Sequence, residues 1–367
     1  MSQWRFFSTL GMAALLLTAG VEGATAGQAA PAQPMRTGQQ VYESICITCH
    51  GPDGRAGVNL ALEQIRKPPD FTDCAFANRE PDRQFLAVAH NGGPARGFSP
   101  LMAPWGSAYT EQELQLAIGH MRTFCKDDRW PRGELNLPLA LVTGKAFPED
   151  EAVVRVASQS GKTVTKVVYE RRFGPLNQWE VALPIQSADA GRGTGIGDVA
   201  LGYKRVLAHS LARGNIFSGS AEVILPTGSE DKGRGEGVAV VEPFLTFGQI
   251  IRRSGFLQAQ AGFGIPASSD RNKDVFWRAA LGRSFEQGRF GRFWSPMLEV
   301  AATRALVSGA GIDWDLAPGT QVTLNTRQHI RLGVGMRFPV TDASVRPKSL
   351  NVYLLWDWYE GGFFQGW

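Results

Sequence analysis

The stretch HIRLGVGMRFPV, residues 329–340, alternates between two kinds of side chain along its whole length. Its even-numbered positions carry large apolar residues from Ile330 to Val340, and its odd-numbered positions carry histidine, arginine, glycine and proline. Successive side chains of a β-strand point to opposite faces, so the stretch predicts a strand with one apolar face. The predicted strand is also longer than the roughly five or six residues usual in soluble sheets.

The same alternation recurs over the C-terminal part of the chain. Residues 257–265 and 350–358 repeat the pattern. Further segments of this kind begin near Ala152, Thr163, Trp179, Asp198, Ile216, Val238, Val275, Phe293 and Gln321. Turn-forming stretches such as GSEDKGRGEG and SSDRNKD separate the segments, so we predict about twelve antiparallel strands.

Two architectures accommodate such strands. A soluble sandwich or closed barrel buries the apolar face, whereas a membrane barrel turns it toward lipid and keeps polar side chains in its lumen. The second face carries charged and amide side chains among many glycines and alanines, namely Glu180, Glu222, Gln260, Arg331 and Arg337. This mixture suits a narrow polar lumen. We therefore predict a transmembrane β-barrel over residues 151–367, with a soluble β-domain as the alternative.

The first residues of the chain are typical of an export signal. Arg5 supplies positive charge, LGMAALLLTAG is a short apolar core, and small residues at 24–26 offer a cleavage point. We predict a signal peptide over residues 1–26 and a Pro-containing linker over residues 27–39. An uncleaved membrane anchor is the alternative. Export would bring the mature protein into a compartment that permits disulfides.

Residues 40–130 have a helical pattern and form a second predicted domain, followed by a linker over residues 131–150. The clearest helix is YTEQELQLAIGHMRTFC. Thr110 and Glu113 have the spacing of a capping box at its start. Leu114, Ile118 and Met121 then recur on one face of this helix.

The overall composition excludes some classes of function. The formal net charge is +4 and 20% of the residues are charged, without a dense Lys/Arg block. This pattern argues against nucleic acid as a partner. The chain also lacks a G-x-S-x-G nucleophile elbow and a phosphate-binding G-x-x-x-x-G-K-[ST] loop. We therefore expect neither a hydrolase nor a transferase.

The pentad CITCH places Cys46, Cys49 and His50 together. A redox dithiol of the thioredoxin type requires a βαβ context, and a zinc site requires further Cys or His at suitable spacing; neither accompanies this motif. In the third chemistry, the two thiols add to the vinyl groups of a haem and the histidine becomes an iron ligand. We predict one covalently bound haem c at this motif.

The segment CITCHGPDGRAG resembles the small monohaem class I cytochromes c of bacteria, and the resemblance extends over residues 40–126. That family takes its distal ligand from a methionine in a loop before the last helix. The matching residue in LMAPWG is Met102, so the resemblance implies iron ligation by His50 and Met102. Core packing is the alternative role of Met102, and His90 is the rival distal ligand; Met121, on the apolar face of the last helix, is expected in the core. A six-coordinate iron suits electron transfer rather than substrate chemistry.

The remaining cysteines are Cys74 and Cys125, both within the predicted helical domain. In an oxidising compartment we expect them to form a disulfide. Two independent buried thiols are the alternative, since the sequence does not give the Cα separation that a disulfide requires.

The segments GTGIGDVALGYKRVL and SAEVILPTGSED resemble porin-type outer-membrane barrels, including barrels associated with the degradation of phenol and other aromatic compounds. This second resemblance covers about residues 168–367. It implies an outer-membrane location in a Gram-negative bacterium.

The predicted function is electron transfer by a haem c that the barrel anchors at the outer membrane, with the cytochrome domain facing the periplasm. The expected partners are a periplasmic redox protein or a small-molecule redox partner, together with outer-membrane lipid. One alternative is an outer-membrane pore for small solutes, including aromatic ones, with an accessory cytochrome domain. Another is a secreted cytochrome with a soluble β-domain that binds a ligand.

Overall fold

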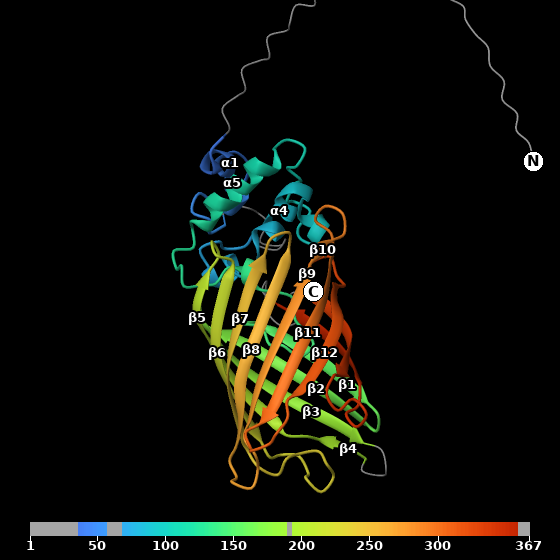
Figure 1. The fold of residues 1–367 in the computed structure, drawn as a ribbon. Coiled ribbons are helices and arrows are strands. Elements are labelled where there is room, and N and C mark those ends of the chain that lie inside the picture. Colours follow the sequence, from blue (N-terminus) through green and yellow to red (C-terminus); the bar gives the residue numbers. More distant parts are fainter. Residues whose placement is uncertain (1–35, 57–67, 189–192, 359–367) are drawn as a thin grey trace, which may run out of the picture. The chain divides into compact units, whose positions relative to one another are not determined.

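The computed structural model describes residues 36–56, 68–188 and 193–358. The predicted signal peptide and most of the first linker lie outside these residues. Arg36–Trp367 form one compact unit. Within this unit, a helical domain is followed by a large antiparallel sheet (Figure 1).

The helical domain contains short helices joined by turns. They are α1 (Gly38–Ile45), α2 (Ile47–His50), α3 (Cys74–Ala77), α4 (Asp82–Asn91) and α5 (Glu111–Arg122), with the 3-10 turns η1 (Gly93–Arg96) and η2 (Gly133–Leu135). Among the described residues, none of the helices combines the length and apolarity needed to cross a membrane.

Helix α5 begins and packs as its sequence predicts. The hydroxyl of Thr110 accepts a 3.2 Å hydrogen bond from the backbone N–H of Glu113, and the Glu113 carboxylate accepts a 2.9 Å hydrogen bond from the backbone N–H of Thr110. This confirms the predicted capping box. Leu114, Ile118 and Met121 are all buried in the core of the helical domain. Helix α1 contributes buried Val41 and Tyr42 to the same core.

The strands begin directly after the predicted linker. They are β1 (Glu151–Gln159), β2 (Lys162–Phe173), β3 (Asn177–Ala188), β4 (Gly193–Ile196), β5 (Val199–Ser210), β6 (Asn215–Leu225), β7 (Val240–Ile251), β8 (Gly255–Pro266), β9 (Asp274–Arg283), β10 (Phe285–Glu286), β11 (Phe293–Ala305), β12 (Asp313–Thr323), β13 (Ile330–Pro339) and β14 (Ser349–Asp357).

The sheet closes on itself. Strand β1 pairs with both β2 and β14, and β9 pairs with both β8 and β11, so the long strands form an uninterrupted antiparallel ring. Short strands β4 and β10 pair only with β3 and β11 and lie off this ring. The twelve strands that remain confirm the predicted antiparallel barrel.

The apolar faces of the strands point outward. Val334, Leu245 and Leu281 expose 38%, 50% and 58% of their surface, whereas inward-facing Gln258 and Glu299 expose 1% and 0%. A water-soluble barrel would show the opposite arrangement, because apolar side chains leave water for the interior. An outward apolar band around a polar interior is typical of a barrel that faces lipid.

One predicted strand start is wrong. We expected a strand to begin near Gln321, but β12 begins at Asp313 and ends at Thr323. Pro318 lies inside this strand, opposite Leu298 of β11. Proline within a run argues against a strand because it lacks an N–H for the ladder, so the sequence pattern concealed the first part of β12.

Candidate functional site

The Cys46–His50 motif lies where α1 gives way to α2. Cys46 is the C-cap of α1, and the backbone N–H groups of Cys49 and His50 both donate to the Cys46 carbonyl, at 3.2 and 2.9 Å. Tight winding of the chain around this carbonyl brings both thiols and the imidazole to one cavity.

The turn after the motif reverses the chain through glycine. Gly51 ends α2 at φ 74°, a conformation that glycine adopts readily. Its carbonyl accepts a 2.8 Å hydrogen bond from the buried Tyr42 hydroxyl. The His50 carbonyl in turn accepts a 3.0 Å hydrogen bond from the N–H of Ala56. These bonds fix the backbone on which the imidazole is carried.

The Met102 loop lies between α4 and α5. The Met102 carbonyl accepts a 2.9 Å hydrogen bond from the N–H of Gly93, and the N–H of Trp105 donates to Ala89 of α4 at 3.0 Å. Met102 and Trp105 both line the cavity that contains the cysteine motif. Met121 of α5 lines it as well, whereas His90 is not among the lining residues.

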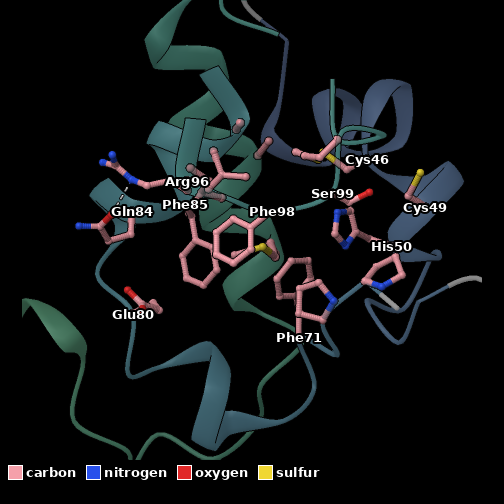
Figure 2. Close-up of a pocket in the computed structure, with 18 of the residues that line it drawn as sticks. Cys46, Cys49, His50, Phe71, Glu80, Gln84, Phe85, Arg96, Phe98 and Ser99 are labelled. Carbon is pink, nitrogen blue, oxygen red and sulfur yellow. Dashed lines mark hydrogen bonds between the residues drawn. The ribbon is translucent and has the colours of Figure 1, made fainter. Parts of the chain in front are cut away.

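The cavity has a volume of about 840 Å³ and mainly apolar walls. This volume lies within the range of about 300–1,000 Å³ that is usual for cofactor pockets. Figure 2 shows Cys46, Cys49 and His50 on one side of the cavity, with Phe71 and Phe85 near its middle. The His50 ring lies 4.9 Å from the Phe71 ring, centroid to centroid. Pro68 and Pro69 also line the cavity.

The donor atoms in this cavity fit a haem. The Nδ1 atom of His50 is buried without a hydrogen-bond partner among the described residues. Burial lowers the pKa of His50 to about 4, so at neutral pH the imidazole is uncharged, as an iron ligand must be. Burial, with a smaller contribution from Cys49, raises the pKa of the Cys46 thiol to about 12. A protonated thiol is the form that adds to a vinyl group with its own hydrogen.

Cys74 and Cys125 form a disulfide with a Cα–Cα distance of 5.1 Å. The bond joins the start of α3 to the segment that follows α5. Neither residue lines the large cavity, so the disulfide lies apart from the Cys46 and Cys49 thiols.

The other side of the cavity is polar. Arg96, Gln84 and Glu80 line it on the helical domain, as Figure 2 shows, opposite the cysteine pair. Arg96 Nε donates to the Gln84 side chain at 3.1 Å. Two residues of the barrel, Arg327 and His329, also line this cavity.

Two turns of the barrel pack on the helical domain. Phe290, in the turn before β11, is 3% exposed and belongs to the apolar core formed by α1, α4 and α5. Arg83 of α4 forms an ion pair with Glu286, and Gln84 donates a 2.8 Å hydrogen bond to Gln328. Gln328 belongs to the second turn, residues 324–329, and its bond to Gln84 holds this turn beside the cavity.

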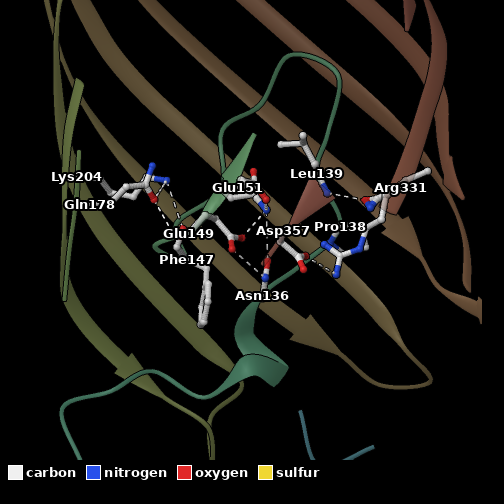
Figure 3. Close-up of polar contacts among 12 residues, drawn as sticks. Asn136, Pro138, Leu139, Phe147, Glu149, Glu151, Gln178, Lys204, Arg331 and Asp357 are labelled. Atoms are coloured by element: carbon white, nitrogen blue, oxygen red, sulfur yellow. Dashed lines mark hydrogen bonds and ion pairs between the residues drawn. The ribbon is translucent and has the colours of Figure 1, made fainter. Parts of the chain in front are cut away.

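Residues 135–150, here called the lumenal segment, run through the interior of the barrel (Figure 3). Side chains from strands all round the sheet bind its backbone. They are Arg155 of β1, Gln178 of β3, Lys204 of β5, Ser218 of β6, Gln258 and Gln260 of β8, Arg278 of β9, Glu299 of β11, Gln321 of β12 and Tyr353 of β14.

Glu299 holds the centre of the lumenal segment. Its carboxylate accepts hydrogen bonds from the backbone N–H groups of Leu141, Val142 and Thr143, at 2.5, 3.0 and 2.8 Å. Hydrogen bonds to a charged group are about twice as strong as neutral ones. The adjacent carbonyl of Val142 accepts from Arg278 at 3.0 Å.

Apolar side chains of the lumenal segment fill the remaining space. Leu135, Leu139 and Leu141 are 1%, 3% and 8% exposed. Inward-facing glycines make room for them: a Cβ added at Gly335 would lie 2.3 Å from Leu141 Cδ1, and one at Gly319 would lie 2.7 Å from it. Protein packing tolerates neither distance. The barrel interior is therefore packed around the lumenal segment.

The end of the lumenal segment carries a buried charge cluster. Lys145 forms ion pairs with Glu149 and, at 3.0 Å, with Glu151, and all three side chains are almost fully buried. Asp150, which lies between Glu149 and Glu151 in the chain, forms an ion pair with Arg79 of the helical domain. The segment is thus tied to both the barrel and the helical domain.

Sequence reasoning found the motif and the loop of Met102 but missed the polar side of the cavity. Arg327 and His329 are remote from the motif in sequence, and no local pattern marks them. Residues 131–150 were expected to be a plain linker. A signal was available there, because Leu135, Leu137, Leu139 and Leu141 alternate as a buried extended segment would.

Comparisons with known proteins concern a family model and solved structures. Residues 33–121 match the family model described as cytochrome C oxidase, cbb3-type, subunit III. The comparison with curated proteins found no match.

Solved structures similar to this chain include the KdgM porin, with 8% identity, a TM-score of 0.39 and coverage of 57% of this chain and 99% of the porin. The NanC porin has 7% identity and a TM-score of 0.41, with coverage of 56% and 99%. An outer-membrane channel from Pseudomonas putida F1 has 11% identity and a TM-score of 0.41, with coverage of 60% and 99%. A cytochrome c family model therefore matches the helical part of the chain, and the solved structures similar to the chain include porins.

Proposed function

We propose that this protein carries electrons at the outer membrane through one covalently bound haem c in its helical domain, and that the barrel anchors this domain in the membrane. The observation that carries the proposal is the shared cavity of about 840 Å³, which Cys46, Cys49, His50 and Met102 all line. The match of residues 33–121 to a cytochrome c family supports the same chemistry.

The chain's own residues have distinct roles in this proposal. The S–H groups of Cys46 and Cys49 would hold the haem by each adding across one vinyl C=C, which forms one C–S and one C–H bond without an external oxidant. The neutral His50 imidazole and the Met102 thioether would hold the iron. Haem c, when bound, supplies a one-electron Fe(III)/Fe(II) couple. Phe71, Phe85 and Trp105 line the cavity and exclude water from it.

The lengths of the barrel connections support a periplasmic position of the helical domain. Residues 174–176, 211–214 and 252–254 are short turns at one end of the strands, where residues 284–292 form a longer connection, and residues 226–239 and 340–348 are long loops at the other end, where residues 160–161 form a tight turn. Outer-membrane barrels have short periplasmic turns and long extracellular loops. The helical domain contacts Glu286 and Gln328, which belong to the end with the short turns.

Two features of the barrel, its filled lumen and its outward apolar faces, each argue against one of the alternative functions. A pore for small solutes needs an open path, but the lumenal segment is bonded to strands all round the barrel. A secreted soluble β-domain would have to expose the apolar strand faces to water, at an unfavourable cost of about 25 cal/mol per Å². We therefore favour a membrane anchor with a closed interior.

The proposal is tested by producing the full chain in a Gram-negative host with haem c maturation. Wild-type protein should be found in the outer-membrane fraction, give a haem stain after denaturing electrophoresis and show a reduced-minus-oxidised cytochrome spectrum. The Cys46→Ala/Cys49→Ala double variant should lose the haem stain. The Cys74→Ala/Cys125→Ala double variant, which also removes two cysteines but neither thiol of the cavity, should retain it. Wild-type protein without bound haem would overturn the proposal, as would a product recovered only in the soluble fraction.

A further inference from the structure

We propose that the barrel completes the haem site: Arg327, from the turn between β12 and β13, together with Arg96 of the helical domain, binds the haem propionates. This inference rests on the proposed function and deepens it. The haem would then be held jointly by two domains, and its reduction potential would depend on a residue of the membrane barrel.

The two sides of the cavity match the two edges of a haem. In a haem, the vinyl groups that react with cysteine and the two propionates lie on opposite edges of the ring. Cys46 and Cys49 lie on one side of the cavity, and Arg96 and Gln84 lie on the other (Figure 2). A haem attached through both thiols would therefore direct its propionates toward the Arg96 side.

Arg96 is buried and has a hydrogen-bond donor that is unpaired in the part of the chain that the structure describes. This side chain is 7% exposed, and its Nη2 atom is buried with no hydrogen-bond partner among the described residues. Burial lowers the pKa of Arg96, which reflects the cost of removing the guanidinium from water. A buried donor without a partner is energetically unfavourable. A carboxylate at this place would remove that cost.

Hydrogen bonds hold Arg327 of the barrel next to Arg96. Its Nε donates to the Arg96 carbonyl at 3.2 Å and its Nη2 donates to the Gly97 carbonyl at 2.6 Å. The guanidinium lies 4.8 Å above the Phe98 ring, and Phe98 lines the cavity. Arg327 is thereby fixed beside Arg96 at the same polar side, although more than two hundred residues separate them in the chain.

The balance of charge at this side favours an anion. Glu80 lines it as well, but His329 lies between Glu80, at 3.4 Å, and Asp357, which also binds the imidazole. Glu80 therefore faces a partner of its own. Glu286, whose charge also acts on Arg96, forms an ion pair with Arg83. Both carboxylates thus have partners of their own, and guanidinium groups match carboxylates in bidentate geometry.

The test is a redox titration of the full-length, haem-loaded protein. Arg327→Gln removes a positive charge beside the haem. Because the ferric haem carries one more positive charge than the ferrous haem, this loss stabilises the ferric form and should lower the midpoint potential. A tenfold change in the relative stability of the two oxidation states corresponds to about 59 mV for one electron. We expect a shift of about this size for Arg327→Gln and for Arg96→Gln, with altered propionate bands in the resonance Raman spectrum. Arg327→Lys, which keeps the charge, should recover most of the potential.

One control separates propionate binding from docking of the domains. Arg289→Gln removes the ion pair with Glu111, and neither residue lines the cavity. This variant should keep the wild-type potential and Raman bands. An equal shift in this variant would overturn the inference, as would a haem-loaded Arg327→Gln protein with wild-type potential and bands. Wild-type protein that binds no haem would instead overturn the proposed function itself.

Discussion

The backbone N–H of Thr143 donates a 2.8 Å hydrogen bond to the carboxylate of Glu299, a fully buried residue on the inward face of β11. Leu141 and Val142 donate to the same carboxylate. One strand residue thus binds three successive N–H groups of a segment that would otherwise have no partners for them. Since buried backbone donors need acceptors, Glu299 stabilises the lumenal segment inside the barrel.

Glu299→Gln should therefore open the barrel to ions. The uncharged amide accepts weaker hydrogen bonds, and bonds to charged groups are worth about 1.5–3 kcal/mol each. Loss of one such bond should raise the open population about tenfold, measured as ion conductance of single barrels in a planar bilayer. Wild-type protein should conduct weakly.

The matched control is Glu222→Gln. Glu222 lies on β6 opposite Glu242 of β7, and it makes no hydrogen bond to the lumenal segment among the described contacts. Its variant should conduct like the wild type. High conductance of the wild-type barrel would show that the lumenal segment does not close it.

Met102→Ala should abolish the weak near-infrared band that arises from sulfur-to-iron charge transfer. It should also lower the midpoint potential, because a thioether ligand favours ferrous iron. The measurement is an absorption spectrum of the ferric protein followed by a redox titration.

Met121→Leu is the control for Met102, because Met121 is 6% exposed and lines the same cavity. This variant should keep the near-infrared band. If Met121→Leu loses the band and Met102→Ala keeps it, the assignment of the distal ligand is reversed.

Reduction of the Cys74–Cys125 disulfide should destabilise the helical domain. The two cysteines are 51 residues apart, and closing a loop of this length stabilises a fold by about 4 kcal/mol in the chain-entropy description. Denaturant unfolding followed by haem absorbance should show this loss after thiol treatment. The Cys74→Ala/Cys125→Ala variant, treated identically, should be insensitive to the reductant; a reductant effect in this variant would assign the change to another group.

Leu245→Lys should destabilise the barrel in lipid by about 2–4 kcal/mol. Leu245 lies near the middle of β7 with 50% of its surface exposed on the outward face. The measurement is denaturant unfolding in vesicles, read by the heat-modifiable mobility of the folded barrel. Val345→Lys places the same charge in the loop between β13 and β14, where the side chain is 79% exposed, and should cost almost nothing. Equal costs for the two variants would argue against a lipid-facing β7.

Much of the fold was predictable because its signals are local. The alternation from Ile330 to Val340 predicted both β13 and the direction of its faces. The pair Thr110 and Glu113 predicted the start of α5. Prediction failed at β12, where Pro318 interrupts the pattern although the ring of neighbouring strands still pairs with that segment. Pairing with neighbours overrides local propensity, and a single chain segment does not reveal it.

The sequence by itself determined the CITCH motif, the apolar strand faces and the division into a helical and a β part, because spacing and period are properties of short segments. Only the tertiary structure decided that residues 135–150 fill the barrel and that Arg327 lies beside Arg96. Leu141 and Glu299 are 158 residues apart and meet only when the ring of strands closes. Closure is a property of the whole sheet, since the inward side of each strand becomes an interior only when the first and last long strands, β1 and β14, pair with each other.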